Sequence, residues 1–364
     1  MSSGTAQAGQ AAPNPHDHAL VFGIRRYFGT PAGWPSDLQG PDNDAVAVAK
    51  WLTRPDGGGL PQENVHVVCS ADAPDPFTDR GEPDQDRVVA VLRELVQLPK
   101  AYKDEGNRQF AGRRLYVHIS GHGWATRSRQ AALVTAEAVK ERPLNVDVTS
   151  WTEWFREAAT FKEIVLWADT CAERIQTTVL QGTPTASGLL AMGHPNAPSV
   201  RVFESFAAGI GLRAVENQMS DNKWHGAFTY ALLQGLEGQA STPVTSESLS
   251  NYLRNAMKKF QSNEDQARGQ VAHEPAFGSQ DPITFGAPPR QTVPVRITFP
   301  PECVGQLVTV GRGRGSPPVA ATVLTGTEWK VSLEPGLYVV FVDTLGLSRT
   351  FEAVGVEHVS VTVE

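Results

Sequence analysis

Cysteine is scarce in this sequence, with only Cys69, Cys171 and Cys303 among 364 residues. The three are far apart and odd in number, which excludes the disulfide framework of a small secreted domain. Proteins without disulfides are typical of a reducing compartment, so we expect a cytoplasmic location. A reducing environment also keeps a thiol free to react.

Long apolar runs and long basic runs are both missing. No stretch of about 18 apolar residues occurs, so the sequence predicts no membrane-spanning helix. Thirty-two basic and 39 acidic side chains give a net charge of −7, and without a basic run we expect no nucleic-acid partner. Residues 1–17 lack the basic and apolar regions of a secretory signal, and their Ala, Gly, Ser and Pro content predicts a disordered leader.

Two sequence patterns divide the chain, and its length also suggests two domains. Residues 18–286 alternate apolar runs with helical patterns, which predicts an α/β domain whose mostly parallel sheet is covered by helices on both faces. After the proline-rich stretch GAPPRQTVP, residues 291–364 show short alternating strands broken by glycine, which predicts a small all-β sandwich. The Glu-Pro-Gly of residues 334–336 suits a hairpin turn between strands at 329–333 and 337–342.

The predicted β-sandwich carries no catalytic pattern. It is similar to the PEGA-like and immunoglobulin-like modules that are appended to many bacterial proteins. We expect it to recruit a regulatory partner, and a purely stabilising role is the alternative.

Two apolar runs of the α/β domain end abruptly in small and polar residues. RRLYVHISGHG closes at His122 and Gly123, and KEIVLWADTCAE reaches Cys171. Their continuous apolar character suits strands that are covered on both faces. Because ligands bind at the carboxyl ends of strands in open parallel sheets, His122 and Cys171 are expected to meet over one cleft.

A thiol beside an imidazole can lose its proton and become a nucleophile. Taken one at a time, His122 is best interpreted as an ordinary loop histidine and Cys171 as a buried thiol. Their matching positions at two strand ends instead favour a functional pair. His118 lies inside its strand and reads as a core histidine. Trp151, Trp154 and Phe155 follow a helical spacing that indicates core packing.

Four short motifs occur in the α/β domain: L-Q-G-P-D-N-D-A after the first strand, S-G-H-G, D-x-C, and G-x-F-T-x-A-L-L from Gly226 to Leu233. They resemble bacterial caspase-like cysteine peptidases, closer to metacaspases and orthocaspases than to animal caspases. His122 and Cys171 are 171 − 122 = 49 residues apart, and a separation of about 50 is known for caspases. The resemblance covers roughly residues 18–285.

The resemblance implies a caspase-like fold and a cysteine endopeptidase acting on protein or peptide substrates through a thioester acyl-enzyme. His122 would be the general base and Cys171 the nucleophile, and the backbone N–H groups of Gly123 and Cys171 would receive the oxyanion. The residues after Cys171 are Ala-Glu-Arg, where metacaspases usually continue with His-Ser-Gly. A catalytically inactive scaffold of the same fold is therefore the alternative.

Two aspartates bear on specificity. Asp169 projects to the same side of its strand as Cys171, so its carboxylate is expected beside the thiol. The resemblance matches Asp169 and Asp44 to the acidic substrate pocket of metacaspases, which implies cleavage after Arg or Lys. The alternatives are a salt bridge from Asp169 to Arg25 or Arg26, and a helix N-terminal acid at Asp44.

Other chemistries are weaker matches. A zinc site built on His118, His122 and Cys171 lacks an evident fourth ligand, and Ser120 lacks the G-x-S-x-G elbow of a serine hydrolase. Many metacaspases need calcium, but Glu137, Glu141 and Asp147 are too scattered to predict a calcium site. We therefore expect no cofactor or metal, with calcium activation as the open alternative that no clear motif supports.

Overall fold

The computed structural model describes residues 14–28, 37–70, 82–125, 128–139, 143–172, 193–241, 243–260, 274–277, 281–286, 293–313, 318–333, 336–353 and 359–363. The chain divides into two compact units, Met1–Pro288 and Pro289–Glu364. Each unit has its own apolar core. No helix in the described segments is both long and apolar enough to cross a lipid bilayer.

A six-stranded sheet forms the centre of the first unit, in the order β14-β10-β9-β5-β1-β2. Its strands are β1 (Asp17–Gly23), β2 (Val65–Cys69), β5 (Gly112–Gly121), β9 (Phe161–Thr170), β10 (Arg201–Phe206) and β14 (Glu274–Phe277). Neighbouring strands are parallel except β10 and β14, which are antiparallel. The mostly parallel sheet expected from the sequence is confirmed.

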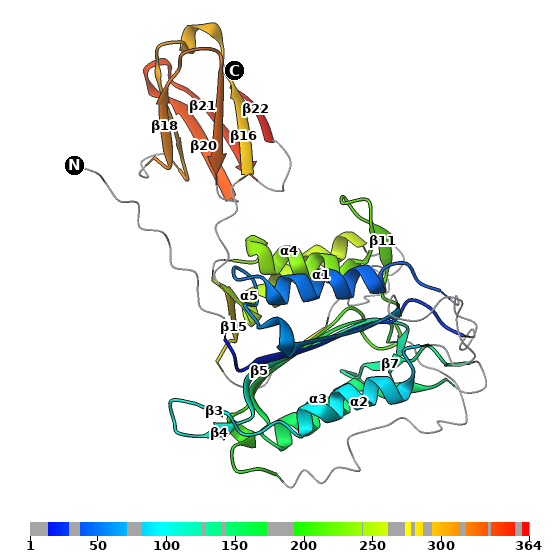
Figure 1. Cartoon of the computed structure of the whole chain (residues 1–364). Coiled ribbons are helices and arrows are strands. Elements are labelled where there is room, and N and C mark those ends of the chain that lie inside the picture. Colours follow the sequence, from blue (N-terminus) through cyan, green and yellow to red (C-terminus); the bar gives the residue numbers. More distant parts are fainter. Residues whose placement is uncertain are drawn as a thin grey trace. The chain divides into compact units, whose positions relative to one another are not determined.

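Helices cover both faces of this sheet (Figure 1). On one face lie α1 (Pro41–Thr53), α4 (Ala227–Gln234) and α5 (Ser246–Ala256), and α4 continues as a π-helical turn over Gly235–Gln239. On the other face lie α2 (Gln85–Val96) and α3 (Val148–Glu157). Each face buries a separate apolar cluster against the sheet, which explains why β5 and β9 are apolar at almost every position.

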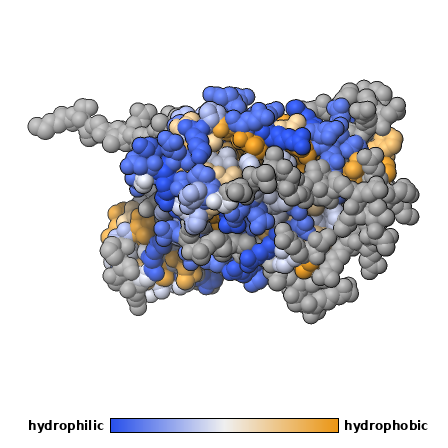
Figure 2. Space-filling model, turned by 90° about the horizontal axis from the view of Figure 1, so that it is seen from below, coloured by the Kyte–Doolittle hydropathy of each residue, from blue (hydrophilic) through white to orange (hydrophobic). Residues whose placement is uncertain are grey.

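The α2 and α3 face illustrates how the helices are held. Trp151 and Phe155 of α3 are almost completely buried, and Trp154 packs at the edge of the same cluster, so their predicted core role is confirmed. The opposite side of α2 is charged, with Arg87, Arg93 and Glu94 exposed. Figure 2 views the molecule from this side, and its coloured residues are mostly hydrophilic with small separate apolar groups.

Short strands complete the first unit. They are β3 (Tyr102–Lys103), β4 (Gln109–Phe110), β6 (Gly123–Trp124), β7 (Ala132–Val134), β8 (Asn145–Asp147), β11 (Glu216–Gln218), β12 (Trp224–Gly226), β13 (Val244–Thr245) and β15 (Thr284–Gly286). β6, β7 and β8 form one small sheet, and β11 pairs with β12. These small sheets lie at the end of the central sheet where the predicted dyad is found.

The first strand begins one residue earlier than the sequence predicts. Asp17 was expected in a disordered leader, but it begins β1 and its carboxylate pairs with Arg113 of β5. The Asp17 side chain is fully buried, and this ion pair offsets the cost of burying its charge. Residues 1–13 of the predicted leader lie outside the described residues.

The second unit is a sandwich of two sheets, in the orders β19-β16-β22 and β18-β17-β20-β21. Its strands are β16 (Val293–Thr298), β17 (Leu307–Gly311), β18 (Ala320–Val323), β19 (Glu328–Leu333), β20 (Gly336–Val342), β21 (Leu347–Ala353) and β22 (Val359–Thr362). Inward side chains of both sheets share one core. The predicted all-β sandwich is thus found, and its recruiting role stays a prediction.

One turn of the β-sandwich differs from expectation. The sequence predicts a hairpin between the strands now seen as β19 and β20, but β19 pairs with β16 and β20 pairs with β17 and β21. β19 and β20 therefore belong to different sheets, and Glu334 and Pro335 of the predicted turn lie outside the described residues. A Pro-Gly pair between two strands indicates a change of direction but does not say which strand each will pair with.

Candidate active site

His122 and Cys171, the predicted dyad, follow the ends of neighbouring strands, because β5 and β9 are adjacent in the sheet. Gly121 of β5 is in register with Thr170 of β9, and His122 and Cys171 each follow one residue later. Both strands run in the same direction, so both residues lie at the carboxyl edge of the sheet. The cleft predicted from the two strand ends is present.

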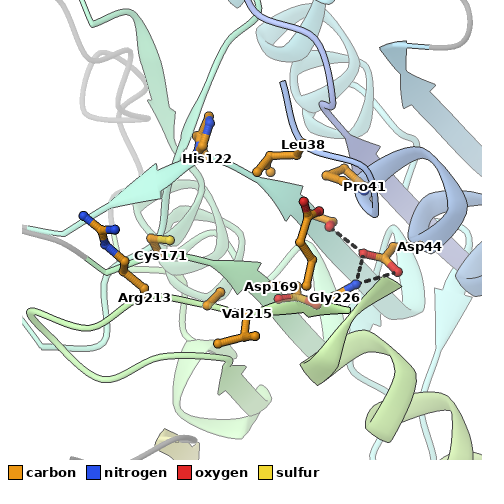
Figure 3. A pocket seen from close by; sticks show the side chains of 13 residues that line it. Leu38, Pro41, Asp44, His122, Asp169, Cys171, Arg213, Val215 and Gly226 are labelled. Carbon is orange, nitrogen blue, oxygen red and sulfur yellow. Dashed lines mark hydrogen bonds between the residues drawn. The ribbon is translucent and has the colours of Figure 1, made fainter. Parts of the chain in front are cut away.

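A cavity of about 170 Å³ occupies this edge. Its lining includes every predicted side chain of the site, which Figure 3 shows together: His122, Cys171, Asp44 and Asp169. Of the three cysteines, Cys171 is partly exposed whereas Cys69 and Cys303 are buried. Arg213 lies near Cys171 at one side of the cavity, and the two aspartates lie at the other (Figure 3).

Tyr27 fixes the backbone of His122. The His122 N–H donates to the Tyr27 hydroxyl over 2.7 Å, and that hydroxyl donates to the carbonyl of Ile24 over 2.8 Å. The two rings are also in contact, with centroids 4.7 Å apart. Burial raises the pKa of Tyr27, so the phenol stays protonated and available as a donor.

Tyr27→Phe is expected to lower kcat about tenfold and the free energy of unfolding by about 1–3 kcal/mol, because it leaves a buried N–H without its acceptor. Steady-state kinetics and thermal unfolding measure the two effects. Tyr116→Phe is the matched control, since it also removes a buried hydroxyl, here one bonded to Arg114. Equal losses of activity in both variants would contradict a specific role for Tyr27.

Gly123 lies directly against the end of β9. A β-carbon at this position would come within 2.5 Å of the Thr170 β-carbon and 3.0 Å of the Cys171 carbonyl oxygen. Only glycine fits between the two strand ends without moving them. Gly123 therefore holds the backbone of the histidine segment close to the cysteine segment, as an oxyanion site between their N–H groups would require.

Asp44 is completely buried and its carboxylate is fully engaged. Oδ2 accepts from the Ser120 hydroxyl over 2.8 Å and from the Gly226 N–H over 3.0 Å. Oδ1 lies 2.9 Å from His225 Nδ1 and 3.3 Å from the Gly226 nitrogen. Although Asp44 does lie in the first turn of α1, these contacts direct it into the cavity wall.

Asp169 is held differently. Its Oδ2 accepts from the backbone N–H and the hydroxyl of Thr229, over 2.9 and 2.7 Å. Burial, together with the nearby charge of Asp44, raises the pKa of Asp169 to about 7. The alternative, a salt bridge from Asp169 to Arg25 or Arg26, is not found among the described residues: the carboxylate accepts from Thr229, and Arg25 pairs with Asp42.

A caspase domain model matches residues 16–283, well over half of the chain. The chain belongs to the caspase family of peptidases. A curated probable protease of a Desulfuromonadales bacterium is 27% identical over 251 residues, which cover 65% of this chain. The match spans only 27% of that relative's length.

Among solved structures, caspase-1 of the moth Spodoptera frugiperda is similar to the chain. The two share 12% sequence identity with a TM-score of 0.44, over 79% of this chain and 96% of the insect protein. The match to the caspase domain model, and not this structural likeness, identifies the α/β sheet with helices on both faces as a caspase-like fold, as expected from the sequence.

Several residues of this caspase-family site were not assigned to it from the sequence. They hold the predicted side chains in place: Tyr27, Ser120, Thr229 and His225. Ser120 and Thr229 stand inside motifs that resemble the family, S-G-H-G and G-x-F-T, which is the signal that points to them. His225 and Tyr27 carry no such signal, because their contacts join segments far apart in the chain.

The weaker chemistries do not fit the geometry. His118 is fully buried, as expected of a core histidine, and its Nε2 lies 3.1 Å from the Thr229 hydroxyl oxygen. The Ser120 hydroxyl donates to Asp44, so it points at a carboxylate. Within the described ranges, no group of three or more His, Cys, Asp or Glu side chains is arranged to hold a metal ion.

Proposed function

We propose that this caspase-family chain is a cysteine endopeptidase that cleaves proteins after Arg or Lys. One observation carries the proposal: a thiol, an imidazole and two buried carboxylates line the same cavity at the carboxyl edge of the sheet. A thiol and an imidazole suit acyl transfer, and buried carboxylates suit a guanidinium or ammonium group.

The reaction would begin with transfer of the Cys171 proton to the imidazole of His122. The thiolate then attacks the carbonyl carbon of the scissile bond, and the backbone N–H groups of Gly123 and Cys171 donate to the oxyanion. Collapse of this intermediate expels the amine, which takes the proton from His122, and leaves a thioester on Cys171. Water, deprotonated by His122, hydrolyses the thioester and regenerates the thiol.

The cavity would receive the side chain that precedes the scissile bond. Cys171 lies at one side of it and the carboxylates at the other (Figure 3). A chain bound with its scissile carbonyl at the thiol would therefore place that side chain toward Asp44 and Asp169. The apolar stem of Arg or Lys would contact Leu38, Pro41 and Val215, which also line the cavity.

The test is hydrolysis of fluorogenic peptides that are identical except for Arg, Lys, Asp or Ala before the cleaved bond. We expect cleavage after Arg and Lys at least about 100-fold faster than after Asp or Ala, because a buried ion pair is formed with only two of the four. Parallel assays with calcium and with a chelator determine whether the reaction needs the ion. Preference for Asp would overturn the pocket assignment, and an inactive preparation under all conditions would favour a scaffold.

A further inference from the structure

His225 lies at the acidic end of the cavity, between two carboxylates. It belongs to β12 and its side chain is 6% exposed. Nδ1 lies 2.9 Å from Asp44 Oδ1, and Nε2 lies 3.1 Å from Asp221 Oδ2. A neutral imidazole has a hydrogen on only one ring nitrogen, whereas an imidazolium has one on both. Both contacts are therefore hydrogen bonds when His225 is a cation, or when Asp44 itself holds the shared proton.

The pair formed by Asp44 and His225 has no net charge in either arrangement. With the proton on the ring, a carboxylate faces an imidazolium. With the proton on Asp44, a neutral acid faces a neutral ring. Asp44 therefore adds no uncompensated negative charge to the cavity, and its two oxygens are already engaged by Ser120, His225 and Gly226.

Asp169 differs from Asp44 in having one carboxylate oxygen that accepts no hydrogen bond from the described residues. Thr229 donates twice to Oδ2, whereas Oδ1 accepts no hydrogen bond from any residue that the structure describes. Asp169 also lines the cavity. The two aspartates are thus unequal: one is saturated and neutralised, and the other has an open oxygen.

We propose that His225 is a positioning residue for specificity, which neutralises Asp44 so that Asp169 alone supplies the charge that binds a singly charged basic side chain. This inference rests on the proposed peptidase function. It assigns unequal roles to two carboxylates that were expected from the sequence to share one guanidinium.

The charged and titratable groups around His225 come from five elements: Asp44 of α1, Asp169 of β9, Glu216 of β11, Asp221 and Lys223 of the β11–β12 turn, and Tyr230 of α4. Most of them are acidic, and they favour the imidazolium. The two carboxylates that contact the ring raise the pKa of His225 against the opposite effect of its burial. Without the imidazolium, Asp44 and Asp169 would be two buried anions near each other, and one would take up a proton.

Matched peptides with arginine or citrulline before the cleaved bond isolate this effect, since citrulline has the shape of arginine without its charge. The ratio of kcat/KM for the two peptides cancels any titration of the catalytic dyad. In the wild-type protein we expect the ratio to rise with pH through a midpoint near pH 7, the raised pKa of Asp169, and to level off about one to two pH units higher, where Asp169 is an anion.

His225→Gln keeps a donor for Asp44 but removes the positive charge. In this variant the midpoint of the pH dependence of the arginine-to-citrulline ratio is expected to move up by about one pH unit. The ratio below pH 7 should then fall about tenfold, mainly through KM. Asp221→Asn removes one of the two carboxylates that stabilise the protonated ring of His225. It should move the midpoint in the same direction by a smaller amount. An unchanged midpoint in His225→Gln, or equal losses for both peptides, would show that His225 serves only in packing.

A second measurement does not depend on activity and separates this inference from the proposed function. In the wild-type protein labelled with ¹³C at its histidine rings, the signal that disappears in His225→Gln should titrate above the ordinary histidine pKa of 6.5. A midpoint at or below that value would overturn the inference even if the peptidase is active. A raised midpoint in a protein that cleaves neither peptide would overturn only the proposed function.

Discussion

Cys171→Ala and His122→Ala are each expected to lower kcat/KM for an arginine peptide by about 10⁴-fold or more. A nucleophile and its base act as one unit, so the removal of either costs nearly as much as the removal of both. The double variant should therefore be no slower than the more damaged single variant. Hydrolysis is followed with the fluorogenic arginine peptide at high enzyme concentration.

The other two cysteines provide the matched controls. Cys69 ends β2 and Cys303 lies in the core of the β-sandwich, and both are buried. Cys69→Ala and Cys303→Ala remove the same thiol without touching the cavity, and we expect activity within about twofold of the wild type, since small core truncations act mainly on stability. Full activity in Cys171→Ala, or its loss in either control, would contradict the assigned nucleophile.

Asp169→Asn is expected to reduce kcat/KM for arginine and lysine peptides by about 10²- to 10³-fold, and to leave the citrulline peptide within about threefold. Asparagine has the same shape and its side-chain oxygen can still accept from Thr229, so the change removes charge and little else. Loss of one partner of a buried charged pair costs about 2–5 kcal/mol, which corresponds to such a factor. Equal losses for arginine and citrulline would mean that Asp169 serves the structure and does not bind the basic side chain.

Gly226→Ala tests the same carboxylate without replacing it. A β-carbon at Gly226 would lie 2.0 Å from Asp169 Oδ2, so the carboxylate must move away from its place beside Thr229. The variant should therefore resemble Asp169→Asn in its selectivity. Gly326→Ala is a control substitution, because a β-carbon there meets nothing within 4 Å. Wild-type selectivity in Gly226→Ala would contradict the described position of Asp169.

The placement of the dyad was predictable because it depends on local signals. β5 and β9 are continuous apolar runs that end in polar residues, and parallel strands bring such ends to one edge of a sheet. The proximity of His122 and Cys171 therefore follows as soon as the two strands are known to be neighbours in the sheet. The same reasoning brought Asp169 to this edge of the sheet, two residues before Cys171 at the end of β9, and both line the cavity. Its carboxylate, however, is held by Thr229 and lies toward Asp44, not beside the thiol as expected (Figure 3).

The network around Asp44 was less predictable. His225 is 181 positions away from Asp44, and their contact depends on how α1 packs beside β12. A sequence pattern shows which residues are apolar or charged but not which distant charges will meet. For the same reason the sequence suggested two equivalent carboxylates, whereas their hydrogen bonds distinguish them.

The β-sandwich gives a third case. Alternating apolar residues identified the strands of β16, β19 and β20, but the pairing of β19 with β20 was wrong. Partners in a sandwich are chosen by packing across two sheets, and a turn sequence alone does not encode that choice.

The measurement that tests the central claim most directly is covalent labelling with an arginine peptidyl chloromethyl ketone, followed by peptide mapping. A thiolate at Cys171 displaces chloride and forms a thioether to the reagent's methylene carbon, so one label per chain is predicted on Cys171. The label should be lost in His122→Ala. A matched chloromethyl ketone with citrulline in place of arginine should label Cys171 far more slowly. Labelling confined to Cys69 or Cys303, or reaction at Cys171 that does not depend on His122, would contradict an activated thiol in a pocket for basic side chains.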